Sequence, residues 1–420
     1  MKVLVISRNA WNDTNSIGNT LTNFFHDLKD VEFANIYFRS SKPHNSVCKR
    51  YYRVTETEII KKWLSPHKVG KEFFLTNDSV LNGSDYSDRE EKKVIRFIHK
   101  HGIKLAYKMS DVIWYSRRWM NKNLDRFIES FCPDAVFTFV KSAPQYYLTL
   151  RYLKEKYNTP IFAWIADDEY TFLSKAGSAK KIENLRYIIE KSNVVTGCSE
   201  EICDHYNSVF GCKAIPLYKG CELPDIKKTK TNNPIQIVYA GNLLYGRLDI
   251  VKKVSAAIEK TNCANFEIYS NTLIDAEDVA FFDGTKCSKY MGQRDYEVIR
   301  QRLSEADIVL HVESFEESQI LRTKYSFSTK IIDCLQSGSV LLAIGPSEIS
   351  SIKYVNKIPG AYVIDDINSI ESKLTSCLNE SSTFCERAEK IVKFAQKHHD
   401  SKINSNNIFN NFNQIIKGEH

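Results

Sequence analysis

Short apolar runs rich in β-branched and aromatic residues alternate with helical patterns along this 420-residue chain, and the alternation occurs twice. The runs of the first half are residues 2–7, 33–38, 135–140, 161–166, 194–197 and 214–218. Those of the second half are residues 235–241, 266–270, 307–312, 339–345 and 361–365. Strands that alternate with helices form parallel sheets covered by helices on both faces. The sequence therefore predicts an α/β protein with two parallel-sheet halves of similar size.

A polar segment separates the two halves. Residues 224–234 read PDIKKTKTNNP, which is rich in Lys and Asn and bounded by prolines, a composition typical of an interdomain linker. We expect one domain over residues 1–223 and a second over residues 235–395. The stretch from about residue 381 to residue 416 contains neither Pro nor Gly, and it is predicted to be helical with a break near Asp400.

Composition and charge narrow the classes of function. The chain has 58 Lys and Arg against 51 Asp and Glu, which gives a mildly basic net charge of +7. A dedicated nucleic-acid binder usually concentrates more positive charge on one face. The eleven cysteines of the chain form no C-x-x-C pair, which favours free thiols in a reducing compartment. Few apolar residues precede Arg8, and no apolar run of about 18 residues occurs. We expect a cytoplasmic protein that binds no nucleic acid.

Residues 89–131 form a basic and aromatic insertion in the first half. Its cations are Lys92, Lys93, Arg96, Lys100, Lys104, Lys108, Arg117, Arg118, Lys122 and Arg126, and its aromatics include Phe97, Tyr107, Trp114, Tyr115 and Trp119. One interpretation is a helical surface that lies against anionic lipid at the inner face of the cell membrane. The other is an amphipathic helix that packs its aromatics on the first domain and turns its charges to water. The two interpretations are compatible.

The segment 325–338, YSFSTKIIDCLQSG, predicts a helix that opens with hydroxyl residues and a lysine. Ser326, Ser328 or Thr329 can cap the helix, whose first N–H groups favour an anion, and Lys330 adds a fixed charge. Asp333 can accept hydrogen bonds from a ribose diol. The segment thus predicts a cradle for a diphosphate, although simple capping with a solvated Asp333 explains the same residues.

The segment 239–247, YAGNLLYGR, predicts a strand, a glycine loop and a helix start. Gly241 lets a ligand approach the backbone closely, and Arg247 offers a planar fork to phosphate oxygens. Both this segment and 325–338 follow strands of the second half, at the sheet edge where open α/β sheets bind ligands. Asn242, beside Gly241, belongs to the same predicted site.

These segments resemble GT-B-fold glycosyltransferases of the family 4, retaining type, in the branch found in bacterial surface-polysaccharide synthesis. The resemblance rests on residues 239–247 and 307–338, and on 197–222 and 395–416 near the two domain crossings. It implies two Rossmann-like domains facing a cleft, with the donor in the second domain and the acceptor in the first. It also implies that a C-terminal helix over 396–420 returns to the first domain.

The resemblance implies transfer of a sugar from a nucleotide-diphosphate donor, with UDP or GDP as the nucleotide, to a hydroxyl of a glycan or lipid-linked saccharide in surface or capsular polysaccharide synthesis. It implies neither a cofactor nor a metal ion. The donor-binding residues are expected to be Gly241, Asn242, Arg247, Glu313, Ser328, Thr329, Lys330 and Asp333. Arg247 and Lys330 are expected to stabilise the leaving diphosphate. The family often has two glutamates eight positions apart; here Asp333 stands at the second position and Tyr325 at the first. Glu313, Glu316 and Glu317 lie upstream and are candidate substitutes.

Two loops of the first half are candidates for the acceptor side. Arg8 and Asn9 precede the first helix, which carries Gly18 and Asn19, and an ordinary β–α turn explains them equally well. After the strand 161–166, Asp167 or Asp168 can orient the acceptor hydroxyl as a catalytic carboxylate. A solvated acidic loop is the plain alternative, and a metal-binding D-x-D role is the less favoured one.

Other features leave alternatives open. Cys198, Cys203 and His205 approach the spacing of zinc ligands, but ordinary buried thiols are the favoured interpretation. His311 belongs either to the core or to the cleft. Two other functions compete with sugar transfer. One is a nucleotide-sugar epimerase on the same fold, and the other is a catalytically inactive peripheral binding protein.

Overall fold

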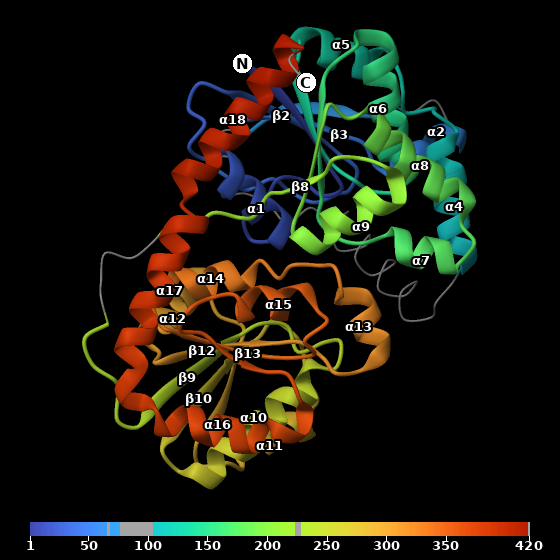
Figure 1. The fold of residues 1–420 in the computed structure, drawn as a ribbon. Helices are drawn as coiled ribbons and strands as arrows, with labels where there is room; N and C mark the ends of the chain where they lie inside the picture. The colour runs from blue at the N-terminus through green and yellow to red at the C-terminus, as the bar shows by residue number, and fades with distance from the viewer. Residues whose placement is uncertain (65–67, 76–103, 223–227, 419–420) are drawn as a thin grey trace. The chain divides into compact units, whose positions relative to one another are not determined.

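The computed structural model of the chain describes residues 1–64, 68–75, 104–222 and 228–418, which form two compact units (Figure 1). The first unit contains Met1–Leu217 together with Ser405–His420, and the second contains Tyr218–Asn404. Each unit is built on one sheet.

The first unit has an eight-stranded sheet in the order β4-β3-β2-β1-β5-β6-β7-β8. Its strands are β1 (Lys2–Ser7), β2 (Glu32–Tyr37), β3 (Arg50–Arg53), β4 (Lys71–Phe74), β5 (Ala135–Phe139), β6 (Ile161–Ile165), β7 (Val194–Gly197) and β8 (Ile215–Pro216). Every pair is parallel except β3 with β4. β5 and β6 are buried along their whole length, as expected for strands covered on both faces.

Nine helices of the described residues belong wholly or partly to this unit. They are α1 (Ser16–Phe25), α2 (Glu56–Leu64), α4 (Lys104–Tyr115), α5 (Lys122–Phe131), α6 (Pro144–Tyr157), α7 (Tyr170–Lys175), α8 (Ala179–Lys191), α9 (Glu200–Phe210) and α18 (Ser401–Lys417). α18, drawn red in Figure 1, buries Phe412 against Phe25 and Phe162, with ring centroids 6.2 and 5.2 Å apart. Aromatic packing therefore ties the C-terminal residues to the core of the first unit.

The insertion at 89–131 contains α4 and α5, while residues 89–103 lie outside the described part of the chain. Trp114 and Trp119 are buried and pack on Phe38, with ring centroids 5.4 and 5.9 Å away. The cations Lys108, Arg117, Arg118, Lys122 and Arg126 are exposed. The prediction that aromatics pack inward is therefore confirmed for these two tryptophans, and the prediction of lipid contact remains a prediction.

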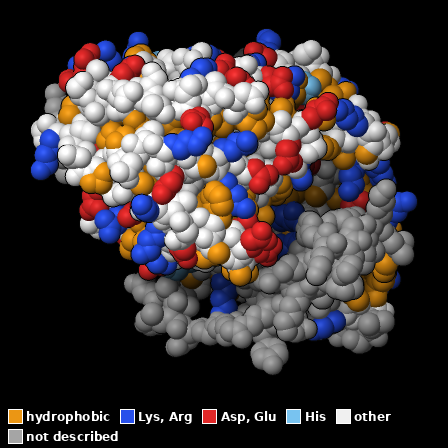
Figure 2. Space-filling model, turned by 90° about the horizontal axis from the view of Figure 1, so that it is seen from below, with side chains coloured by type: hydrophobic (Ala, Val, Ile, Leu, Met, Phe, Trp, Pro, Cys, Tyr) orange, Lys and Arg blue, Asp and Glu red, His pale blue; other side chains and the backbone are white. Residues whose placement is uncertain are grey.

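The second unit has a six-stranded parallel sheet in the order β11-β10-β9-β12-β13-β14. Its strands are β9 (Ile235–Ala240), β10 (Ala264–Tyr269), β11 (Ser288–Gly292), β12 (Ile308–Val312), β13 (Val340–Ile344) and β14 (Tyr362–Ile364). Its helices are α10 (Arg247–Thr261), α11 (Ala276–Asp283), α12 (Tyr296–Glu305), α13 (Glu317–Thr323), α14 (Lys330–Gln336), α15 (Ser350–Asn356), α16 (Ile370–Asn379) and α17 (Phe384–His398), with 3₁₀ turns at Ile367–Ser369 and Ser381–Thr383. Viewed from below, the described surface carries acidic and basic side chains interspersed (Figure 2).

The strands predicted from apolar runs are all present, although β8 has only two residues. The predicted helix break appears between α17 and α18. Three strands were not predicted, namely β3, β4 and β11; β4 and β11 are edge strands. All three are short and carry charged or polar residues, so they lack the unbroken apolar run by which the other strands were predicted. Charged residues are common in edge strands such as β4 and β11. Within the described residues, no helix is long and apolar enough to cross a bilayer.

Candidate functional site

The strand order of the second sheet reverses between β9 and β12, because β10 and β11 lie to one side and β13 and β14 to the other. Open α/β sheets bind ligands beyond the carboxyl ends of the strands at such a switch point. Gly241 follows β9, and Glu313 follows β12. The two segments singled out in the sequence therefore meet at the place where this topology favours a ligand.

Gly241 is required by the close approach of two side chains. A Cβ atom at this position would lie 2.6 Å from Tyr239 Oη and 3.2 Å from Lys330 Nζ. The Tyr239 hydroxyl donates a hydrogen bond to the carbonyl of Asn242 at 2.6 Å and so fixes the loop. Glycine thus lets the ammonium group of Lys330 sit against the backbone that follows β9.

Arg247, the first residue of α10, is held on three sides. Its Nε donates to the carbonyl of Val312 at 3.1 Å, its Nη1 to Asn242 Oδ1 at 2.9 Å, and its Nη2 to Glu313 Oε2 at 2.7 Å. A guanidinium has five N–H donors, so two remain for another acceptor. The prediction that Arg247 lies at the sheet edge is confirmed, and Asn242 and Glu313 act as its anchors.

Glu313 and His311 form the buried side of this site. Both are almost fully buried, and His311 Nε2 lies 3.3 Å from Glu313 Oε1, an ion-pair distance without the alignment of a hydrogen bond. Burial opposes ionisation of Glu313, but the contacts with His311 and Arg247 outweigh it and lower the pKa of the carboxyl. Of the two alternatives for His311, the structure supports the core, since the side chain is buried beside Glu313.

Lys330 is the second cation of the site. Burial, and next the positive charge of Arg247, lower the pKa of its ammonium to about 8. Glu313 and Asp333 oppose this shift. Two cations held together and partly desolvated favour an anion between them, because the anion relieves their repulsion.

The start of α14 differs from the prediction. Thr329 occupies the N-cap but makes no side-chain capping bond, and the Ser328 N–H donates to Ser351 Oγ at 2.9 Å. The prediction of a side-chain cap is therefore wrong for Thr329. α14 has only seven residues, so the charges of Arg247 and Lys330 contribute more to an anion site than the helix dipole does.

Asp333 is paired with a residue that the sequence did not single out. Its Oδ1 lies 2.9 Å from Lys219 Nζ, and Lys219 is only 7% exposed. Lys219 stands more than a hundred positions earlier, and no sequence pattern connects the two residues. The pair holds one carboxylate oxygen of Asp333 and leaves the other for a further donor.

The first sheet reverses its order between β1 and β5, and the predicted acceptor-side residues lie near that point. Lys141, just after β5, lies 3.0 Å from Asp167 Oδ2 and 3.3 Å from Glu169 Oε1. Burial lowers the pKa of Lys141, but the two carboxylates outweigh burial and raise it. The sequence indicated Asp167 and missed Lys141 and Glu169.

Asp168 points inward while Asp167 remains exposed. The Asp168 side chain is 3% exposed, accepts from the Thr171 N–H at 3.3 Å and lies 3.8 Å from His205 Nε2. Of the two predicted carboxylates, only Asp167 is accessible to an acceptor. Asp168 therefore stabilises the start of α7 by accepting a hydrogen bond from its backbone.

The four residues predicted after β1 lie in two places, Arg8 and Asn9 in the first loop and Gly18 and Asn19 in α1. Arg8 is exposed at the end of β1, and partial desolvation followed by the charge of Arg39 lowers its pKa. Asn9 and Asn19 are half-buried. A Cβ at Gly18 would lie 2.0 Å from the carbonyl oxygen of Asn12, so close packing explains this glycine without a ligand.

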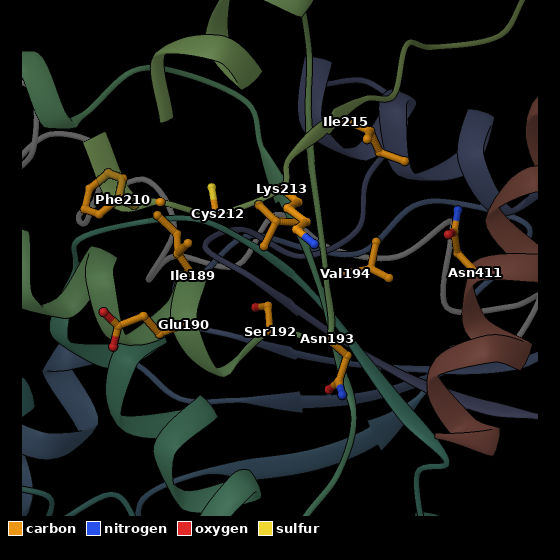
Figure 3. A pocket seen from close by; sticks show the side chains of 12 residues that line it. Ile189, Glu190, Ser192, Asn193, Val194, Phe210, Cys212, Lys213, Ile215 and Asn411 are labelled. Carbon is orange, nitrogen blue, oxygen red and sulfur yellow. The ribbon is translucent and has the colours of Figure 1, made fainter. Parts of the chain in front are cut away.

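A separate pocket of about 370 Å³ lies in the first unit (Figure 3). It is lined by the start of β7 at Val194, by the end of α9 at Phe210 and by Asn411 of α18. Strand β7 begins there and ends at Gly197, so the pocket lies at the amino end of that strand. It contains none of the predicted site residues.

Comparison with known proteins gave matches in solved structures alone, since no family model and no curated protein matches the chain. HepE from Anabaena in complex with UDP is 10% identical, with a TM-score of 0.63 over 99% of this chain and 100% of that one. Sucrose-phosphate synthase from Thermosynechococcus elongatus is 10% identical, with a TM-score of 0.63 over 100% of both chains. The G117R mutant of S. aureus TarM, in a complex that includes UDP, is 11% identical, with a TM-score of 0.60 over 98% and 99%. At this identity the likeness establishes the fold: the chain has the two-domain GT-B fold.

Proposed function

We propose that the protein is a glycosyltransferase that moves a sugar from a nucleotide-diphosphate donor to a hydroxyl of a glycan or lipid-linked saccharide. The observation that carries the proposal is the pair Arg247 and Lys330 at the switch point of the second sheet, where Gly241 makes room for the Lys330 side chain. Three hydrogen bonds hold Arg247, and burial lowers the pKa of Lys330, so the two cations suit a diphosphate.

The chemistry follows from the charges. The bond between the anomeric carbon and the diphosphate oxygen breaks, and a bond from that carbon to the acceptor oxygen forms. Negative charge develops on the leaving diphosphate, and preorganised cations stabilise it. Arg247 and Lys330 supply that charge, so we propose a reaction that needs neither a metal ion nor a cofactor.

We propose retention of configuration, as in the family 4 enzymes that the sequence resembles. Two carboxylates were predicted at the donor site, and each is already engaged, Glu313 by Arg247 and Asp333 by Lys219. Neither is placed as a free nucleophile. The acceptor proton would therefore pass to an oxygen of the leaving phosphate, which balances the exchange without a carboxylate base.

UDP is the first nucleotide to test. HepE was solved with UDP and with UDP-glucose, and the TarM complex includes UDP. GDP remains the alternative, because Arg247 and Lys330 recognise phosphate and not the base. We propose surface or capsular polysaccharide synthesis as the pathway, on the sequence resemblance.

We further propose that the first unit works at an anionic membrane surface, where a lipid-linked acceptor resides. α2 exposes Ile60 and Trp63, and α4 exposes Met109 and Val112. The Arg118 guanidinium lies 5.6 Å from the Trp63 ring. Exposed apolar side chains beside cations favour binding to a surface of anionic lipid. Cosedimentation with vesicles of anionic and of neutral lipid tests this part, and equal binding to both would contradict it.

A thermal-shift panel with UDP, GDP, CMP, ADP and dTDP, and NAD as the control, tests the function. A ligand at about 100 times its dissociation constant adds about 2.7 kcal/mol to the free energy of unfolding. One diphosphate should raise the melting temperature of the wild type and should not do so for Lys330→Met. Lys353→Ala, which removes an exposed lysine of α15, is the matched control. A shift with NAD alone, or with no nucleotide, would overturn the proposal.

A further inference from the structure

Tyr245 has a left-handed backbone conformation in a tight turn and not at the end of a helix. Five non-glycine residues of the described chain have positive φ, and four of them lie at the ends of helices. Cys132, Asn158 and Asn262 are the C-caps of α5, α6 and α10, and Arg117 lies just after α4. A left-handed residue is the usual way to end a helix.

Tyr245 ends no helix. It lies between β9 and α10 with φ 61°, directly before Gly246, which has φ 73° and is the N-cap of α10. Positive φ in a bulky residue is strained, and Gly or Asn would adopt this conformation more easily. The Arg247 N–H donates to the Leu244 carbonyl at 3.4 Å, so Tyr245 and Gly246 are the central residues of a type I′ turn, which requires positive φ at both. This turn fixes the backbone that carries the Tyr245 side chain.

The side chain of Tyr245 is presented to solvent beside the proposed diphosphate site. Tyr245 is 45% exposed, and its ring centroid lies 5.9 Å from the Arg247 guanidinium. The Arg322 guanidinium of α13 lies 5.1 Å from the same centroid and steadies the ring. An exposed, oriented aromatic ring therefore stands next to the arginine that we assign to the phosphates.

We propose that Tyr245 is a sugar-binding residue whose exposed ring receives the apolar C–H face of the pyranose attached to the diphosphate. The inference rests on the proposed function, because it takes the position of the diphosphate at Arg247 and Lys330 as given. The transferred sugar is bonded directly to that diphosphate, so it must lie close to Arg247, and the Tyr245 ring is a nearby apolar surface. Carbon atoms of a sugar and an aromatic ring attract each other at about 3.5–4 Å.

The proposal separates two parts of the donor. Arg247 and Lys330 bind the nucleotide diphosphate, whether or not a sugar is attached, and Tyr245 contacts only the sugar. Loss of the ring should therefore weaken binding of the nucleotide sugar and leave binding of the free nucleotide unchanged. A purely structural role of Tyr245 would affect both ligands alike.

The test uses three variants of the full chain. Tyr245→Asn removes the ring and suits the left-handed backbone, so it should fold at least as stably as the wild type. Tyr245→Phe keeps the ring. Leu244→Asn alters the neighbouring side chain, which is 51% exposed, and serves as the matched control. Titration calorimetry measures the dissociation constants of UDP and of UDP-glucose, and steady-state kinetics measures KM for donor and acceptor.

We expect Tyr245→Asn to weaken UDP-glucose binding about tenfold, to raise the donor KM correspondingly and to change UDP binding less than twofold. Tyr245→Phe and Leu244→Asn should change all values less than twofold. Equal weakening of UDP and UDP-glucose, no change in either, or a change confined to the acceptor KM would overturn the inference while the proposed function stands. If the wild type binds no nucleotide or nucleotide sugar, the proposed function and the inference both fall.

Discussion

The two sheets have their switch points built alike, but the carboxylates at the two points differ in exposure. At the second sheet, Arg247 and Lys330 surround one buried carboxylate, Glu313, so positive charge is in excess. At the first sheet, Lys141 pairs with Glu169 and with Asp167, whose side chain is 60% exposed, and Arg8 and Arg39 add positive charge at the end of β1. The same topology thus provides a place for an anion in one unit and accessible carboxylates in the other. The exposure of the carboxylates at the strand ends, and not the fold, distinguishes the two.

The largest expected effect tests the cationic side of this comparison. Arg247→Ala and Lys330→Ala each remove a fixed charge from the leaving diphosphate, so each should lower kcat by about 10²–10³-fold. Steady-state kinetics measures the loss, and circular dichroism checks the fold. Lys353→Ala should retain wild-type activity. Full activity in both site variants would remove the assignment of the anion site.

Loss of Glu313 should affect stability strongly. Glu313→Ala leaves the Arg247 guanidinium without its buried partner, and breaking such a pair costs about 3–5 kcal/mol. Urea unfolding measures the change in the free energy of unfolding. Glu313→Gln keeps a hydrogen-bond acceptor and should lose less. A Glu313→Ala protein as stable as the wild type would show that the pair contributes little.

A smaller effect on activity should follow from removing the charge of Asp167 at the first sheet. Asp167→Asn should lower kcat about tenfold or less without changing UDP affinity, because Asp167 is assigned to the acceptor and not to the donor. Kinetics and titration calorimetry separate the two quantities. Reduced UDP affinity in this variant would contradict the assignment of Asp167 to the acceptor, because it would mean that the donor also contacts the first sheet.

The smallest effect is a dependence of UDP affinity on pH. A bound diphosphate favours protonated Lys330 and raises its pKa above the value of about 8 in the free protein. The affinity should therefore be greatest below pH 8 and should fall, by less than tenfold per pH unit, as pH rises above 8. Titration calorimetry from pH 7 to 9.5 measures it. Lys330→Arg should abolish the dependence, and an unchanged slope in that variant would assign the titration elsewhere.

The sequence predicted the sheets well because their central strands are fully buried and read as unbroken apolar runs. It also predicted the glycine and arginine after β9, since a Gly loop before a helix has a recognisable spacing. It did not predict Lys141 or Lys219, because their partners are distant in the chain and only the fold brings them together. Tyr245 lies in the segment 239–247, but no sequence pattern distinguishes it, because its left-handed backbone is a property of the folded loop.

The central claim is that the switch point of the second unit holds a nucleotide diphosphate through two fixed cations. Titration calorimetry of UDP against the wild type and Lys330→Met tests it most directly, since methionine keeps much of the stem and removes the charge. We predict saturable binding to the wild type and at least tenfold weaker binding to Lys330→Met. Equal affinity in the two proteins would contradict the claim, and so would a wild type that binds none of the nucleoside diphosphates.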